Sequence, residues 1–306
     1  MRAVVGAHLR VGVEVGQRMP RAGSVAHFLG PYAYRSSFHA DSPEQEAERA
    51  LAHLEQVITL EGAGTIAAII LETVVGTNGV LVPPPGYLQG VRALADKYGI
   101  VYIADEVMVG FGRVGEWFAV NHFGVTPDLI TFAKGVNSGY VPLGGVVISQ
   151  RIASHFDTVA FQGGLTYSGH PLACATGVAT FEVFERDGIL ERVRDLGARV
   201  VEPRLREIAA KHPSVGEVRG LGLFWAIELV RDAATREPLV PFNASGPDAA
   251  PMAAVAAACK RAGLWPFVHF NRQHVAPPLV ISEDELVRGL DVIDAALDVA
   301  DGYVGS

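Results

Sequence analysis

Short apolar runs alternate with helix-like segments through the first half of the chain. Each run is bounded by loop residues and has the length of a buried strand. We predict strands over residues 66–71, 100–105, 129–133 and 145–149, and helices over residues 42–60 and 86–98. Ser42 is the expected N-cap of the first helix. This alternation is typical of an α/β layer architecture with a mostly parallel sheet.

The pattern changes after Gly169. A helix to about Phe184, a long charged helix over about residues 190–211 and a strand over residues 220–230 are predicted there. We interpret this block as a smaller α+β domain. The predicted organisation is an irregular N-terminal segment, a large domain and a small C-terminal domain with its linking helix, over residues 1–27, 28–170 and 171–306.

Composition excludes several classes of protein. The formal charge of −8 argues against a nucleic-acid partner, which would normally require a basic face. Cys174 and Cys259 are the only cysteines, and His122 and His170 lack second-ligand spacing, so neither a disulfide framework nor a metal site is expected. We find no apolar stretch long enough to span a bilayer and no signal-peptide core, so we expect a cytoplasmic protein.

Two acids, Asp105 and Glu106, follow the apolar run at residues 101–104. An ionised carboxylate is costly to bury without a partner. In one interpretation Asp105 caps the following turn and Glu106 pairs with a surface arginine. In the other, Asp105 meets a ligand, because open α/β sheets bind their ligands at the carboxyl ends of strands.

Lys134 ends the next predicted strand and is followed by Gly135, Gly144 and Gly145. A lysine in this place either extends to solvent or is held in the interior. A neutral lysine amine is what Schiff-base chemistry requires, and glycines let the backbone approach a bulky ligand. Asp105 and Lys134, at the ends of consecutive strands, therefore form one candidate site.

Two stretches, ADEVMVGFGRVGEWFAVNHFGVTPDLITFAKG and GGLTYSGHPLACATG, carry a family resemblance. They resemble the signature of the class III pyridoxal-phosphate-dependent aminotransferases of fold type I, and the resemblance runs from about Phe28 to the C-terminus. It implies a pyridoxal 5'-phosphate cofactor, small-molecule amino donors and keto acids as substrates, and a homodimer with the cofactor site at its interface.

The resemblance also implies roles for single residues. Lys134 matches the Schiff-base lysine, and Asp105 matches the partner of the pyridine nitrogen. Val107 matches the aliphatic residue that packs against the ring, and Thr166 matches the threonine that contacts the phosphate across the dimer interface. The chemistry agrees, because a carboxylate keeps the ring nitrogen protonated and a lysine amine can act as the general base.

Departures from the family pattern bear on the substrate. Met108 stands where the ornithine and GABA branches usually have glutamine, which is more like the branch that uses pyruvate with omega-amino acids or taurine. His274 stands where many relatives carry a carboxylate-binding arginine, and Arg272 lies two residues earlier. Glu72 matches the family's substrate-side glutamate. We take Glu72 and Arg272 as candidate substrate contacts.

The family's N-terminal portion, with its phosphate-binding helix N-terminus and its stacking aromatic residue, has no match in residues 1–27. The resemblance therefore implies an N-terminally truncated aminotransferase with an incomplete large domain. Alternatives are an aminomutase or racemase that uses the same Asp and Lys, and a catalytically impaired, dimer-forming remnant. A hydrolase that uses Asp105 and Glu106 as a carboxylate pair is disfavoured, because adjacent strand residues face opposite ways.

Overall fold

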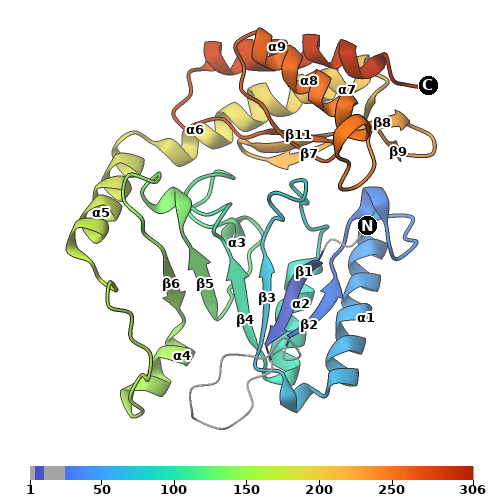
Figure 1. The fold of residues 1–306 in the computed structure, drawn as a ribbon. Helices are drawn as coiled ribbons and strands as arrows, with labels where there is room; N and C mark the ends of the chain where they lie inside the picture. Colours follow the sequence, from blue (N-terminus) through green and yellow to red (C-terminus); the bar gives the residue numbers. More distant parts are fainter. Residues whose placement is uncertain (1–3, 10–24, 306) are drawn as a thin grey trace. The chain divides into compact units, whose positions relative to one another are not determined.

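The computed structural model describes residues 4–9 and 25–305, which divide into two compact units (Figure 1). Unit 1 comprises Met1–Val74, Pro83–Phe111 and Glu116–Asp187, and unit 2 comprises Val75–Val82, Gly112–Gly115 and Gly188–Ser306. The helix that begins at Pro171 therefore falls in unit 1. The domain boundaries drawn from the sequence stay a prediction.

Unit 1 is built on a six-stranded sheet with the order β2-β1-β3-β4-β5-β6. The strands are β1 (Val4–Leu9), β2 (Val25–Leu29), β3 (Ala68–Glu72), β4 (Val101–Asp105), β5 (Leu129–Phe132) and β6 (Gly145–Ile148). The α/β class is confirmed. The sheet is mixed, however, with parallel pairing only between β3, β4 and β5 at its centre. Parallel neighbours need a long crossover, and the segment between β5 and β6 holds only a 3-10 turn, so β6 returns antiparallel.

Strands β1 and β2 correct the expectation that residues 1–27 are irregular. The backbone of β1 pairs antiparallel with β3, placing Ala7 opposite Ile70, and β2 pairs antiparallel with β1. The partner strand β3 is distant in the sequence, so the weak local periodicity of the N-terminal segment did not reveal the pairing. Residues 1–3 and 10–24 of that segment lie outside the described residues.

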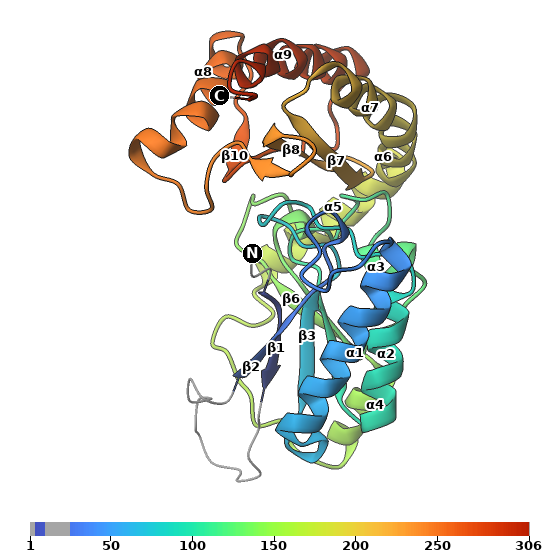
Figure 2. The same ribbon diagram turned by 90° about the vertical axis from the view of Figure 1, so that its right-hand side faces the viewer.

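Two helices, α1 (Pro43–Glu61) and α2 (Tyr87–Tyr98), lie side by side on one face of this sheet (Figure 2). The predicted cap is confirmed: Ser42 Oγ accepts a hydrogen bond of 3.2 Å from the Gln45 amide, and Pro43 occupies the first turn. Leu54, Ile58 and the sheet residue Tyr102 are fully buried. The helices and the sheet thus form the main core of unit 1.

Three further helices complete unit 1, namely α3 (Ala119–His122), α4 (Gln150–Ala153) and α5 (Pro171–Arg186). Apolar side chains of α5 and β6 are unusually exposed. Leu172 is 61% exposed, Val178 is 59% exposed, and Val146, Val147 and Ile148 are between 44% and 50% exposed. These five residues are named here the β6–α5 surface. A folded chain rarely leaves so much apolar area uncovered.

Unit 2 contains a sheet of order β10-β11-β8-β7, with β9 paired to β8. Its strands are β7 (Val215–Leu221), β8 (Phe224–Asp232), β9 (Glu237–Pro238), β10 (Phe267–His269) and β11 (Arg272–Val275). Its helices are α6 (Ile189–Leu196), α7 (Glu202–Lys211), α8 (Ala250–Arg261) and α9 (Glu283–Asp301). Among the described residues of both units, none of the helices combines the length and apolar character needed to cross a membrane.

Two predicted elements of unit 2 are interrupted. A π-helical turn at Gly197–Val201 separates α6 from α7, and Pro203, which has no N–H to donate, follows it in the first turn of α7. The predicted strand over residues 220–230 is a hairpin of β7 and β8 that turns at Gly222. Gly222 has φ +55°, and a Cβ there would lie 2.8 Å from the Val114 backbone, so the turn needs glycine.

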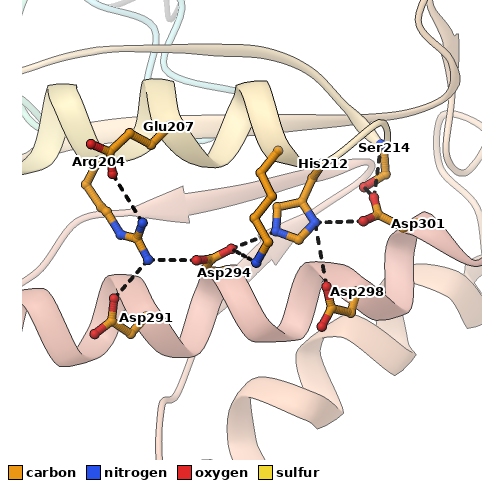
Figure 3. Close-up of polar contacts among 9 residues, drawn as sticks. Arg204, Glu207, His212, Ser214, Asp291, Asp294, Asp298 and Asp301 are labelled. Carbon is orange, nitrogen blue, oxygen red and sulfur yellow. Dashed lines mark hydrogen bonds and ion pairs between the residues drawn. The ribbon is translucent and has the colours of Figure 1, made fainter.

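Helix α9 contacts α7 and the segment just before β7 through a cluster of charged and polar side chains (Figure 3). Asp294 accepts hydrogen bonds of 2.6 Å from both Arg204 and Lys211, and the buried His212 ring lies between Asp294 and Asp301, with N···O distances of 2.7 Å on each side. Burial alone would raise the pKa of Asp294, but the bonds from Lys211 and His212 outweigh it and hold that pKa at about 2.

Asp294→Asn keeps the side chain's size but removes its charge. We expect it to lower the free energy of unfolding near neutral pH by about 1–3 kcal/mol, because hydrogen bonds to charged groups contribute about that much. The folded pKa of about 2 lies below the ordinary 3.8, so this stabilisation is present above pH 3.8 and is lost as the pH falls towards 2. The variant should therefore lose less stability on acidification than the parent chain.

Denaturant unfolding at neutral and acid pH measures both effects. Asp248→Asn, which alters an exposed carboxylate of the same unit, is the matched control and should change little. Equal losses in the two variants would contradict a special role for Asp294.

Candidate functional site

The site is built on the carboxyl ends of the three parallel strands of unit 1. In the register of the sheet, Asp105 at the end of β4 lies opposite Glu72 on β3 and Thr131 on β5. Glu72 and Asp105 are both half-buried. The ladders therefore bring two of the sequence-predicted residues to one edge of the sheet.

Lys134 follows β5 by two residues and begins the 3-10 turn Lys134–Val136. Its side chain is exposed, so of the two arrangements considered from the sequence, the solvent-facing one is observed. Its backbone has φ +42°, in the left-handed region that non-glycine residues rarely occupy. Lys134 thus lies just beyond the end of β5, the strand that pairs with β4.

Asp105 caps the turn that follows it. Its Oδ1 accepts a hydrogen bond of 3.0 Å from the Val107 amide, as one interpretation of the sequence expected. Strand β4 ends at Asp105, so Val107 lies in the turn and is not on the strand face where the alternation argument placed it. The hydrogen bond, and not a shared strand face, links the two residues.

The prediction that Glu106 pairs with a surface arginine is wrong. Its side chain is fully buried and accepts hydrogen bonds from the Thr73 hydroxyl at 2.6 Å, the Ala119 amide at 2.8 Å and the Val120 amide at 2.9 Å. Burial raises the pKa of Glu106, and these three donors act against that rise. Sequence reasoning missed Thr73 because it follows another strand, although an acid directly after an apolar run did indicate the need for a partner.

The other predicted residues are Thr166 in unit 1 and Arg272 in unit 2. Thr166 lies in an exposed segment of unit 1. Arg272 belongs to unit 2, where it is fully buried and its Nε donates to Glu228 at 3.2 Å. Arg219 donates to the same carboxylate at 2.8 Å. Sequence reasoning missed Glu228, which stands between the apolar residues Ile227 and Leu229 in strand β8.

His274 is buried in unit 2 on strand β11. Its burial, together with the nearby His269, Arg219 and Arg272, lowers its pKa to about 4. The ring is therefore neutral at neutral pH. A neutral imidazole does not attract a substrate carboxylate as an arginine would.

Comparisons with known proteins agree with one another. The family model for class-III aminotransferases matches residues 18–297. Diaminobutyrate–2-oxoglutarate transaminase of Halomonas elongata is 40% identical over 73% of this chain and 49% of its own length. Taurine–pyruvate aminotransferase of Bilophila wadsworthia is 38% identical over 84% of this chain and 58% of its own length.

A solved structure shows the same likeness in three dimensions. Taurine:2-oxoglutarate aminotransferase from Bifidobacterium kashiwanohense, in complex with PLP and glutamate, superposes with a TM-score of 0.84 at 40% identity. The match covers 90% of this chain and 61% of that protein. The chain thus spans 49%, 58% and 61% of the lengths of these three proteins.

The placement of Lys134 generates a labelling prediction. If pyridoxal phosphate is added and then reduced with borohydride, we expect the covalent label on Lys134, because its amine is exposed beside the strand edge that holds Asp105. Peptide mapping of the reduced protein identifies the lysine. Lys97 on α2, Lys211 on α7 and Lys260 on α8 serve as internal controls. A label on one of these in place of Lys134 would show the assignment to be wrong.

Proposed function

The chain belongs to the class-III aminotransferase family, and from that premise we propose that Lys134 and Asp105 serve a pyridoxal-phosphate-dependent transamination. The supporting observation is the strand register, which sets the Asp105 carboxylate at the end of a central parallel strand, with Lys134 just beyond the end of its neighbour. A carboxylate and an exposed amine on adjacent strand ends fit the pyridine nitrogen and the aldehyde of this cofactor.

When bound, pyridoxal phosphate supplies an electron sink for the charge left after a C–H proton departs. Asp105 would hold the ring nitrogen's proton through a charge-assisted hydrogen bond, worth about 1.5–3 kcal/mol. Lys134 would carry the substrate's proton between carbon atoms as general base. Val107 would pack against the ring, and Thr166 would contact the phosphate from a second copy of the chain.

We propose an omega-amino acid or similar amine as the donor and a keto acid such as pyruvate as the acceptor. Met108 is half-buried and has no group that would hydrogen-bond a phenolic oxygen as glutamine does. The neutral His274 offers no positive charge to a carboxylate at its own position. Glu72 stays the candidate substrate contact, whereas a carboxylate-binding role for Arg272 would require its pair with Glu228 to open.

The proposed homodimer is supported by the β6–α5 surface of unit 1. Strand β6 exposes Val146 and Val147 on successive positions, so apolar side chains face solvent on both sides of this edge strand. A second copy of the chain would remove that area from water.

The assay that tests the proposed function measures alanine formed from pyruvate, with taurine or an omega-amino acid as donor. For residues 1–306 alone we expect weak cofactor binding and slow turnover that disappears in Lys134→Ala. Turnover should be slow because the chain spans only about half to three fifths of its relatives' length, so groups that hold the phosphate in those proteins need not all be present here.

Two outcomes of this assay would contradict the role of Lys134 or the expectation for residues 1–306. Alanine formation that persists in Lys134→Ala would contradict the proposed role of the lysine. Tight, stoichiometric cofactor binding with the turnover of full-length relatives would contradict the expectation for residues 1–306 alone. Glu48→Gln, on the exposed face of α1, is the matched control and should behave as the parent chain.

A further inference from the structure

The fully buried Glu106 joins three separate parts of unit 1. The Thr73 hydroxyl, immediately after β3, donates to Oε1 at 2.6 Å. At the start of α3, the Ala119 amide donates to Oε2 at 2.8 Å, and the Val120 amide donates to Oε1 at 2.9 Å. We name Thr73, Glu106, Ala119 and Val120 the strand-end latch.

The strand-end latch adjoins both acids of the candidate site. Thr73 follows Glu72, and Glu106 follows Asp105. Backbone bonds run beside it: the Thr73 amide donates to the Asp105 carbonyl at 3.4 Å, and the Glu106 amide donates to the Thr131 carbonyl at 2.9 Å. Glu106 therefore sits where β3, β4 and β5 end together.

Fold stability alone does not explain an acid at this position. Burial raises the pKa of Glu106, which means that its ionised form is costly to keep there. A neutral side chain of similar size would cost less free energy to bury. What a carboxylate offers is two oxygens that accept several donors at once, which fixes the directions from which those donors approach.

We infer that Glu106 is a positioning residue, which holds the turn carrying Asp105 in one orientation through Thr73 and the start of α3. This inference rests on the proposed role of Asp105. The turn is sensitive to Glu106 because the two residues are adjacent, and the Val107 amide that bonds Asp105 Oδ1 is the next N–H along the chain. Loss of one latch bond lets residues 105–107 sample other conformations.

The Val107 amide reports directly on this arrangement, because its hydrogen bond is to the Asp105 carboxylate. Residue-resolved amide hydrogen exchange on the full chain, without cofactor, is therefore the decisive measurement. We expect Glu106→Gln and Thr73→Val to raise exchange at Val107 at least tenfold, with the amides of the α1–α2 core unchanged. Thr73→Ser keeps the hydroxyl and should stay within about twofold of the parent, and the exposed Glu48→Gln should do the same.

A second measurement uses the chain with pyridoxal phosphate in excess. The dependence of the cofactor's visible spectrum on pH should shift in Glu106→Gln towards that of Asp105→Ala, while borohydride labelling of Lys134 is retained. A residue that serves only folding would change the melting temperature and raise exchange throughout unit 1, leaving any bound cofactor's spectrum as in the parent.

Unchanged exchange at Val107 in both latch variants overturns the inference, whatever the cofactor result. So does a rise in exchange spread evenly over the core. A local rise at Val107 that Thr73→Ser does not show supports it. Failure of Lys134 to take the borohydride label would contradict the proposed function separately, since the exchange measurement needs no cofactor.

Discussion

The parallel pairing of β3, β4 and β5 is the constraint on which the rest of unit 1 depends. Parallel strands carry their carboxyl ends to the same edge, and the register then sets Glu72, Asp105 and Thr131 beside one another. The crossover through α2 makes the β3–β4 pairing possible, and burial of α1 and α2 against the sheet stabilises it. The positions of these three side chains follow from the register of this pairing.

Features specified by neighbouring residues could be predicted from the sequence. The cap at Ser42, the central strands and their polar ends all depend on patterns a few residues long. The partners of Glu106 could not be predicted, because Thr73 and α3 meet it only after the strands have paired. The strand β1 could not be predicted either, because its partner β3 is distant in the sequence. The hairpin at Gly222 is predicted as one strand, because the residues around the turn form an apolar run.

In unit 2, likewise, the partners of a buried charged group could not be predicted from the sequence. Glu228 on β8 pairs with Arg219 from β7 and with Arg272 from β11, so its two partners come from two different neighbouring strands. The sequence marks Arg272 as a substrate candidate by its place in a motif, whereas the structure shows it within a buried ion pair. A motif position identifies a residue type, and only the packing around it determines whether the side chain can reach a ligand.

The left-handed backbone of Lys134 has a consequence for the stability of its turn. An L-residue with a Cβ in that conformation costs roughly 1–2 kcal/mol, and glycine would avoid the cost. Lys134→Gly would thus be expected to relieve this conformational cost. The same replacement would remove the amine on which the proposed function depends, so in this turn a relaxed main chain and a lysine side chain exclude each other.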